Sequence, residues 1–223
     1  FPRAVHRAQY GLGERGHRSR VTGELASGPP TLDEETLAKN RIDMEQWMLA
    51  HPLDDAAHRA RSAQWDKVSV PFLSAANWGG QGMHTRGNFE GYMHAASGQK
   101  WLEAHGGAHW ESFYTAYGER LQKRFLGHFL KGEDTGWNRQ PPVQLQIRYP
   151  DRMEERHEHE WPLARTQWTR YYLDPDRLSL SCELPSLSGK ILSYQTQGDG
   201  LLFMLPALAE PLEITGPAAA KLV

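Results

Sequence analysis

The sequence predicts an α/β layer built on parallel strands, followed by an antiparallel β-sandwich. The apolar run at residues 68–76 is typical of a strand that is buried on both faces, as strands in parallel sheets are. Strand-like and helix-like periodicities then alternate as far as Lys131, which is the pattern of layered α/β proteins. After Gly132 the apolar period changes to two, the period of half-buried strands.

The α/β part begins with an amphipathic helix. Thr31 and Glu34 have the spacing of a capping box, and His51-Pro52 is a helix stop. A second short helical stretch, the strand at 68–76 and a glycine-rich loop follow. The remaining elements expected in this part are a helix through residues 89–96, a strand at 100–105 and a helix at 111–131.

The second part has the pattern of short strands separated by turn residues. Val143, Leu145 and Ile147 alternate with polar residues, as in a strand with one buried face. Further β-like runs bounded by Pro, Gly, Asp and Ser lie at residues 169–173, 190–194, 201–205, 212–215 and 218–223. A sandwich of this kind needs about seven strands, and the last run reaches the end of the chain without a partner. We therefore expect a truncated sandwich.

Composition excludes several classes of protein. The chain has 223 residues, with 25 Lys and Arg against 27 Asp and Glu, and this balance argues against a nucleic-acid binder. Apolar residues make up 39%, but no apolar run approaches the ~18 residues of a membrane span. Aromatic residues at 10% need a core or a binding surface to cover them, which argues against a disordered chain. We expect a folded protein that binds neither nucleic acid nor a membrane.

Cysteine usage and the first residues bear on location. The single cysteine, Cys182, excludes an intramolecular disulfide and a cysteine-based zinc site. Such usage fits a reducing compartment, so we expect a cytoplasmic location. The first residue is Phe1, not Met, and no charged-then-apolar signal segment follows it. We expect that sequence upstream of this chain has been lost, and any targeting segment with it.

His109 is the main catalytic candidate. Serine hydrolases of the α/β class place their histidine in a loop after the last strand, and His109 follows the strand expected at 100–105 and the pair Gly106-Gly107. An imidazole there can accept a proton from a nucleophile, because histidine titrates near working pH. A structural or surface histidine is the alternative. The chain contains no G-x-S-x-G segment, so a nucleophile of that class is absent from it.

Metal and phosphate sites have weaker support. His157 and His159 would point the same way from a strand, and two imidazoles with a carboxylate can bind zinc. A third ligand is missing and the surroundings are charged, so an exposed segment is the favoured interpretation. The glycines within 79–82 lack the spacing of a dinucleotide-binding loop. We expect no metal and no cofactor.

Several segments of the chain match a family pattern. They read VPFLSAANW at 70–78, KWLEAHGGAHW at 100–110, QKRF at 122–125, HFLKGED at 128–134, GW at 136–137, PPV at 141–143, EWPLART at 160–166 and EITGP at 213–217. In these segments the chain resembles the cocaine-esterase-like and X-Pro dipeptidyl-peptidase-like serine hydrolases, the CocE/NonD group. The resemblance covers most of the chain beyond His51.

The resemblance implies an α/β-hydrolase core with a helical cap inserted into it and a C-terminal jelly roll. Residues 1–60 would be the end of the cap and the return to the core, 61–138 the last part of the core, and 139–223 the start of the jelly-roll β-sandwich. The family cleaves esters or amides through an acyl-enzyme with a Ser-His-Asp triad and without a cofactor. His109 matches its catalytic histidine, and the nucleophile and oxyanion hole would lie upstream of Phe1.

One position departs from the family pattern. The acid of the triad usually follows the strand before the histidine, and Gly80 stands where that Asp is expected. A triad without an acid to hold the imidazole loses most of its rate. Either another carboxylate substitutes, with Glu90 and the pair Asp54-Asp55 as candidates, or the hydrolase is impaired.

We therefore interpret the chain as part of a serine hydrolase that acts on a small ester, amide or peptide substrate, with an X-Pro peptide among the candidates. Its partner is the upstream half of the same protein. The chain alone is expected to be inactive, because it lacks the nucleophile. The alternative is a non-catalytic interaction or scaffold module derived from a hydrolase, and Gly80 favours it.

Overall fold

The computed structural model describes residues 18–25, 33, 35–36, 39, 42–80, 84–108, 110–186 and 189–222. The chain divides into two compact units, one up to Gln64 and one from Trp65 onward. No helix among the described residues is long and apolar enough to cross a membrane.

The first unit contains two short helices, α3 (Met44–Ala50) and α4 (Ala56–Arg59). Each begins at an aspartate whose carboxylate accepts a free backbone N–H of the first turn, Asp43 for α3 and Asp55 for α4. The expected helix stop is confirmed, since α3 ends at Ala50, before His51-Pro52. The expected capping pair, Thr31 and Glu34, lies outside the described residues.

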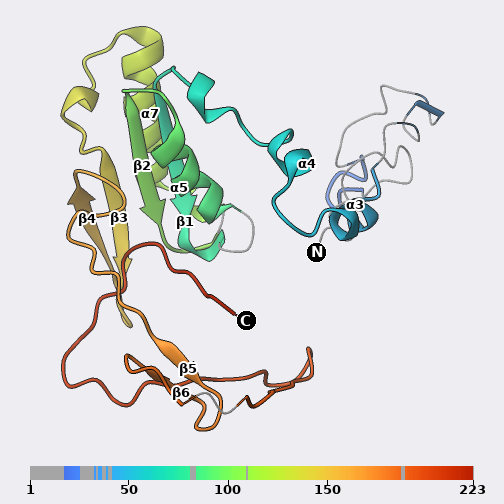
Figure 1. Ribbon diagram of the computed structural model, residues 1–223. Helices are drawn as coiled ribbons and strands as arrows, with labels where there is room; N and C mark the ends of the chain where they lie inside the picture. Colours follow the sequence, from blue (N-terminus) through green and yellow to red (C-terminus); the bar gives the residue numbers. More distant parts are fainter. Residues whose placement is uncertain are drawn as a thin grey trace. The chain divides into compact units, whose positions relative to one another are not determined.

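The second unit is built on a four-stranded sheet in the order β1-β2-β3-β4 (Figure 1). β1 (Phe72–Asn77), β2 (Lys100–His105) and β3 (Val143–Arg148) are parallel to one another, and β4 (Met153–Glu158) is antiparallel to β3. The parallel pairing expected for β1 and β2 is therefore confirmed. The expectation that Val143, Leu145 and Ile147 belong to an antiparallel sandwich is wrong, because β3 pairs in parallel with β2 and extends the same sheet.

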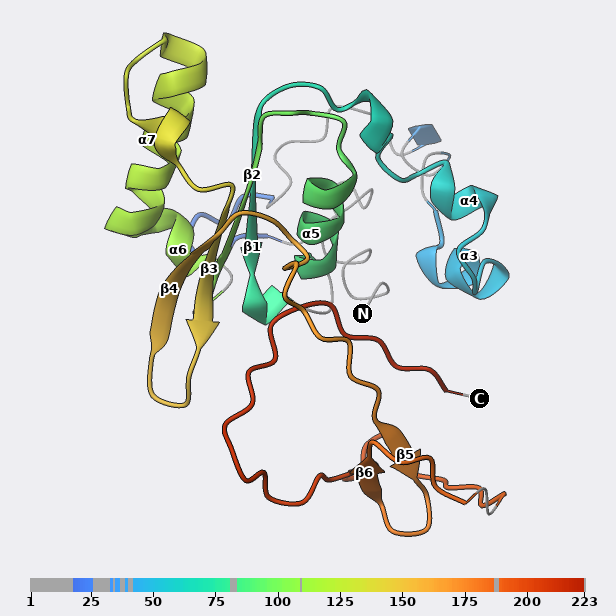
Figure 2. The same cartoon turned by 60° about the vertical axis from the view of Figure 1, so that its left-hand side comes forward.

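Helices lie on both faces of this sheet (Figures 1 and 2). α5 (Thr85–His94) connects β1 to β2, and α6 (Glu111–Tyr114) and α7 (Ala116–Lys131) connect β2 to β3. Single 3-10 turns occur at Trp65–Lys67, Trp78–Gly80 and Trp137–Arg139. The one helix expected at 111–131 is thus divided in two. Thr115 is extended between them, and its hydroxyl accepts the Gly118 N–H at 3.2 Å to cap α7.

The alternation of side chains along the strands separates an apolar face from a polar one. The face toward α5 forms the core, in which Leu102 and Leu145 are fully enclosed together with Phe89 of α5. Trp101, on the opposite face of β2, packs against Phe125, Phe129 and Trp137 with ring centres 5.4 to 6.3 Å apart. Burial of these aromatic rings attaches α7 to the sheet.

The part of the chain after β4 is less regular than its sequence pattern suggested. β5 (Tyr172–Asp174) and β6 (Ser179–Ser181) form a separate two-stranded sheet. The strands expected at 190–194, 201–205, 212–215 and 218–223 are wrong for the described residues, where the only pairing beyond β6 is a bridge from Ser179 to Met204. A β-pattern forms a strand only where a neighbouring strand supplies hydrogen bonds. In the described parts of these runs only Met204 has such a neighbour, and a single bridged residue does not form a strand.

Candidate active site at the ends of β1 and β2

The carboxyl ends of β1 and β2 lie side by side. The strands are parallel, and their last residues, Asn77 and His105, are register partners. The loops that follow both strands therefore leave the same edge of the sheet, which is where α/β proteins usually bind ligands. His109 follows β2 in the sequence but lies outside the described residues, so only its neighbours are described here. On its N-terminal side, the Ala108 N–H donates to the Glu111 carboxylate at 3.1 Å.

Asn77 connects the two strand ends. Its side chain is 4% exposed, and its Nδ2 donates to the backbone carbonyls of Gly106 and Gly107, at 3.3 Å each. Its Oδ1 is buried and has no donor among the described residues. The sequence analysis missed this residue, although a polar side chain at the end of an apolar parallel strand is a recognisable signal.

Gln146 of β3 holds the same loop from the other side. Its Oε1 accepts the Gly106 N–H at 2.9 Å, while its backbone carbonyl accepts the indole N–H of Trp78 at 2.8 Å. The peptide units around Gly106 are thus hydrogen-bonded to side chains of two different strands. Such long-range bonds cannot be read from local sequence pattern.

A buried carboxylate lies directly below these strand ends. Glu103 of β2 is 2% exposed and is hydrogen-bonded to the Nδ1 of His105 at 2.8 Å. It also accepts the hydroxyl of Tyr117 at 2.9 Å. Burial, together with the negative charge of Glu103, raises the pKa of Tyr117, so its hydroxyl remains protonated and donates. The pair Glu103–His105 resembles a catalytic histidine held by an acid. Its hydrogen bond with Tyr117, however, places it in the packing between β2 and α7.

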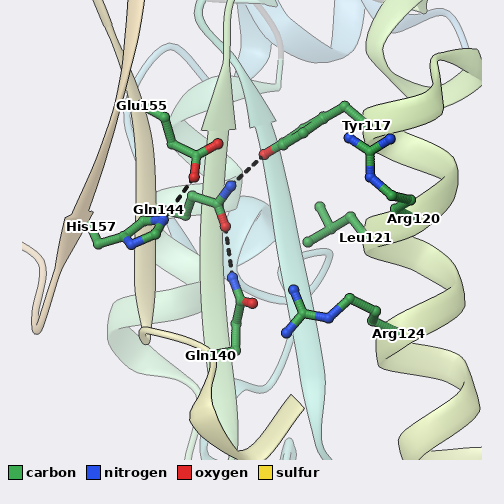
Figure 3. A pocket seen from close by; sticks show the side chains of 8 residues that line it. All are labelled: Tyr117, Arg120, Leu121, Arg124, Gln140, Gln144, Glu155 and His157. Carbon is green, nitrogen blue, oxygen red and sulfur yellow. Dashed lines mark hydrogen bonds and ion pairs between the residues drawn. The ribbon is translucent and has the colours of Figure 1, made fainter. Parts of the chain in front are cut away.

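A pocket of about 360 Å³ lies between α7 and the strands β3 and β4 (Figure 3). Arg120 and Arg124 line its helix side, and Glu155 and His157 line its strand side. Gln144 donates to the Tyr117 hydroxyl at 2.9 Å on its floor. A chain of hydrogen bonds therefore runs from this pocket through Tyr117 and Glu103 to His105. The pocket lining carries both signs of charge, from the two arginines and from Glu155. Glu155 is hydrogen-bonded to His157 at 2.8 Å.

The carboxylates considered as substitutes for the triad acid have other contacts. Glu90 lies on α5, where it pairs with His94 at 3.0 Å and with Arg86 at 3.5 Å. Asp55 belongs to the first unit, where it caps α4. Its hydrogen bond with His51, 2.6 Å long, lowers the pKa of Asp55 to about 2. Gly80 ends the 3-10 turn after β1 and offers no side chain.

Of the two histidines considered as zinc ligands, His157 is hydrogen-bonded to Glu155 at 2.8 Å. Glu158 is buried beside Arg156 and Arg165, and these contacts lower its pKa, with the Arg165 hydrogen bond as the largest cause. Within the ranges that the structure describes, no group of three His, Cys, Asp or Glu side chains is arranged to bind a metal ion.

Comparisons with known proteins point to one family. Residues 135–223 match the X-Pro dipeptidyl-peptidase C-terminal non-catalytic domain. Two crystal structures of a CocE/NonD family hydrolase from Staphylococcus aureus are 33% identical in sequence to this chain, with TM-scores of 0.58 and 0.60. They cover 64% and 67% of the chain, and the chain covers 26% and 27% of theirs. The chain thus spans about a quarter of the length of these hydrolases. A search of curated proteins finds no match.

Proposed function

We propose that this chain, a relative of the CocE/NonD family hydrolases, supplies the catalytic histidine of a serine hydrolase that cleaves esters or amides. The complete protein would also contain an upstream part that contributes the nucleophile and the oxyanion hole. Residues 1–60 would end a helical cap, 61–138 complete the α/β-hydrolase core, and 139–223 begin a jelly roll. The single cysteine favours a cytoplasmic location.

The adjacency of the β1 and β2 carboxyl ends is the observation that supports this proposal most directly. In an α/β-hydrolase the acid and the histidine follow separate strands, and the site forms where the loops meet. Here the loop after β2 leads to His109, and its first residues are bonded to Asn77 of β1. The place of His109 in the sequence, two residues after Gly107, and its residue type therefore suit a general base at that edge of the sheet.

The proposed reaction proceeds in two steps. In the first, the imidazole accepts the proton of the serine hydroxyl as the oxygen bonds to the substrate carbonyl carbon, and then returns that proton to the departing alcohol or amine. In the second, the imidazole accepts a proton from water as the water oxygen bonds to the acyl carbon, and then gives that proton to the serine oxygen as the acyl–serine bond breaks and the acid is released. This chain contributes the proton transfers, because its candidate base lies in the loop after β2. No step needs a cofactor.

A second candidate function is a non-catalytic interaction module derived from a hydrolase. Gly80, at the position expected for the triad acid, favours this alternative. The description of the domain matched at residues 135–223 as non-catalytic fits it as well.

The substitution His109→Ala in the complete protein tests the enzymatic proposal. We expect kcat to fall by ~10³-fold or more, with little change in KM, because a proton-transfer group acts in the transition state and not in substrate binding. Steady-state kinetics with a chromogenic ester is the measurement. Activity that persists at the wild-type level would favour the interaction module.

His105→Ala is the matched control. His105 is bonded to buried Glu103, so its loss should lower stability while activity is retained. If His105→Ala abolishes turnover and His109→Ala does not, the base is His105, four residues earlier, and the assignment to His109 is wrong.

A further inference from the structure

Asn77, the last residue of β1, is held by hydrogen bonds of both its backbone and its side chain. Its backbone carbonyl accepts the hydroxyl of Thr85 at 2.5 Å, and its side chain is almost entirely enclosed. From this fixed position Nδ2 donates to the carbonyls of Gly106 and Gly107, which lie 29 and 30 residues further along the chain. The side chain thus joins the end of one strand to the backbone that follows its neighbour.

Only one orientation of the amide fits this environment. Rotating it by 180° would place Oδ1 against two carbonyl oxygens, so the orientation follows from the hydrogen bonds themselves. In the observed orientation Oδ1 is buried without a donor among the described residues. Buried polar atoms are rarely left unpaired. Among the described residues, Asn77 therefore satisfies its donors on the loop and leaves its acceptor unpaired, an arrangement more typical of a functional site than of core packing.

The surrounding residues leave little room for the amide to move. A Cβ on Gly79 would lie 2.8 Å from Asn77 Oδ1 and 3.5 Å from the Gly107 carbonyl oxygen. Gly107 has a φ of +79°, a conformation that side-chain-bearing residues rarely adopt. Gln146 holds the Gly106 N–H from β3. The segment that leads to His109 is therefore bonded on one side by Asn77 and on the other by Gln146.

We propose that Asn77 is a positioning residue of the hydrolase: its amide holds the carbonyls of Gly106 and Gly107 and thereby places the loop that bears the base. This inference rests on the proposed function. In the family pattern the acid expected at position 80 orients the histidine, and Gly80 has no side chain to do so. The uncharged amide of Asn77 would perform part of that orienting role. Glu90, Asp54 and Asp55 are not needed for that role. Misplacing a reacting group by about 1 Å can cost ~10²-fold in rate, so an effect on turnover is expected without contact between Asn77 and the substrate.

Three variants of the complete protein test the proposal. Asn77→Ala removes the donor, and we expect kcat to fall ~10- to 100-fold while KM changes by less than ~3-fold, since only the transition state depends on the base. Asn77→Asp retains the shape of the side chain but loses the amide donor. Asn88→Ala is the control, because Asn88 also donates to β1, to Ser74 Oγ and the Ala75 carbonyl, but has no hydrogen bond to the described residues of the loop.

The pH dependence of Asn77→Asp separates positioning from a merely structural role. In this variant a protonated carboxyl can donate a hydrogen bond to the carbonyl of Gly106 or of Gly107. An ionised carboxylate has no proton to donate and faces both carbonyl oxygens. Burial raises the pKa of such a carboxyl above the usual ~3.9. We therefore expect the kcat of Asn77→Asp, relative to wild type, to fall between about pH 5 and pH 8, while the deficit of Asn77→Ala stays constant.

The possible outcomes are distinct. Wild-type kcat in Asn77→Ala, with His109→Ala inactive, overturns the positioning role and leaves the proposed function intact. Full activity of Asn77→Asp at pH 8, or an equal loss of kcat in Asn88→Ala, also overturns it. Activity that survives His109→Ala overturns both proposals. Circular dichroism of each variant confirms that it is folded before its kinetics are compared.

Discussion

At the scale of single residues, Glu103 is the least expected feature of the fold. A carboxylate that is 2% exposed is unfavourable unless it is hydrogen-bonded. Here His105 and Tyr117 provide the two partners, one from the same strand and one from α7. Glu103 thus links the sheet to the helix through a polar contact inside otherwise apolar packing. Removing any one of the three side chains leaves a buried polar group without its hydrogen-bond partner.

We expect Glu103→Ala to reduce the free energy of unfolding by about 2–4 kcal/mol, because it leaves His105 and Tyr117 buried without their acceptor. Glu103→Gln should cost less, since one amide oxygen can still accept. Urea unfolding measures both. The surface variant Glu119→Gln, on the exposed side of α7, should change stability by less than about 0.5 kcal/mol. Equal effects of the buried and surface substitutions would contradict this view of Glu103.

At the scale of elements, the division between α6 and α7 depends on close backbone contact. Gly118 lies in the first turn of α7, and a Cβ there would be 2.0 Å from the Ser112 carbonyl oxygen and 3.0 Å from that of Phe113. These are backbone atoms, so they cannot move aside as a flexible side chain can. The turn at Thr115 therefore requires glycine at position 118.

Gly118→Ala should therefore destabilise the protein by about 1–3 kcal/mol, as overpacking against backbone does. Gly87, in the helix α5, has open space around its would-be Cβ. Gly87→Ala is expected to be neutral or to stabilise by up to about 1 kcal/mol, because alanine favours helix. Thermal unfolding of the two variants distinguishes them, and a stabilising Gly118→Ala would show that the α6–α7 junction is not tightly packed.

At the scale of the whole molecule, a charged network connects β4 with residues far along the chain. Arg156 lies 2.7 Å from the Glu158 carboxylate and donates to Glu213 at 2.8 Å, a contact that spans 57 residues. Arg165 also pairs with Glu158. These contacts lower the pKa of Glu158, with the hydrogen bond from Arg165 as the largest cause. The pKa of Glu213 is lowered first by a hydrogen bond with Thr215 and then by Arg156. The network thus ties the irregular C-terminal segment to the sheet.

Acid should loosen this network. A carboxyl whose pKa is lower in the folded state contributes stability above its unfolded value of 4.5, and that contribution is lost as the pH falls below it. Hydrogen exchange, corrected for its intrinsic pH dependence, should show weaker protection of residues 153–166 and 210–217 at pH 4 than at pH 7. Glu213→Gln should reduce protection at pH 7, whereas Glu210→Gln should not. Protection that is unchanged down to pH 3 would contradict this assignment.

The sequence by itself determined the alternation of elements between residues 68 and 148. β2 has the predicted bounds, and β1 and β3 lie within or beside the predicted runs, because strand and helix periodicities are local properties of the chain. The resemblance to the CocE/NonD hydrolases could also be read from the sequence, since it depends on residues that stand in short contiguous segments. His109 was selected in the same way.

Only the tertiary structure decided which side chains support the candidate site. The hydrogen bonds of Asn77, Gln146 and Glu103 join them to other elements or to the loop after β2. The periodicity of the sequence does not predict such long-range contacts. The same holds for β4, whose charged residues became a strand because β3 supplies its hydrogen bonds, and for the runs after residue 189, which remain irregular without such a neighbour. Local pattern sets what a segment can form, whereas a strand or a buried polar bond exists only where another part of the chain completes it.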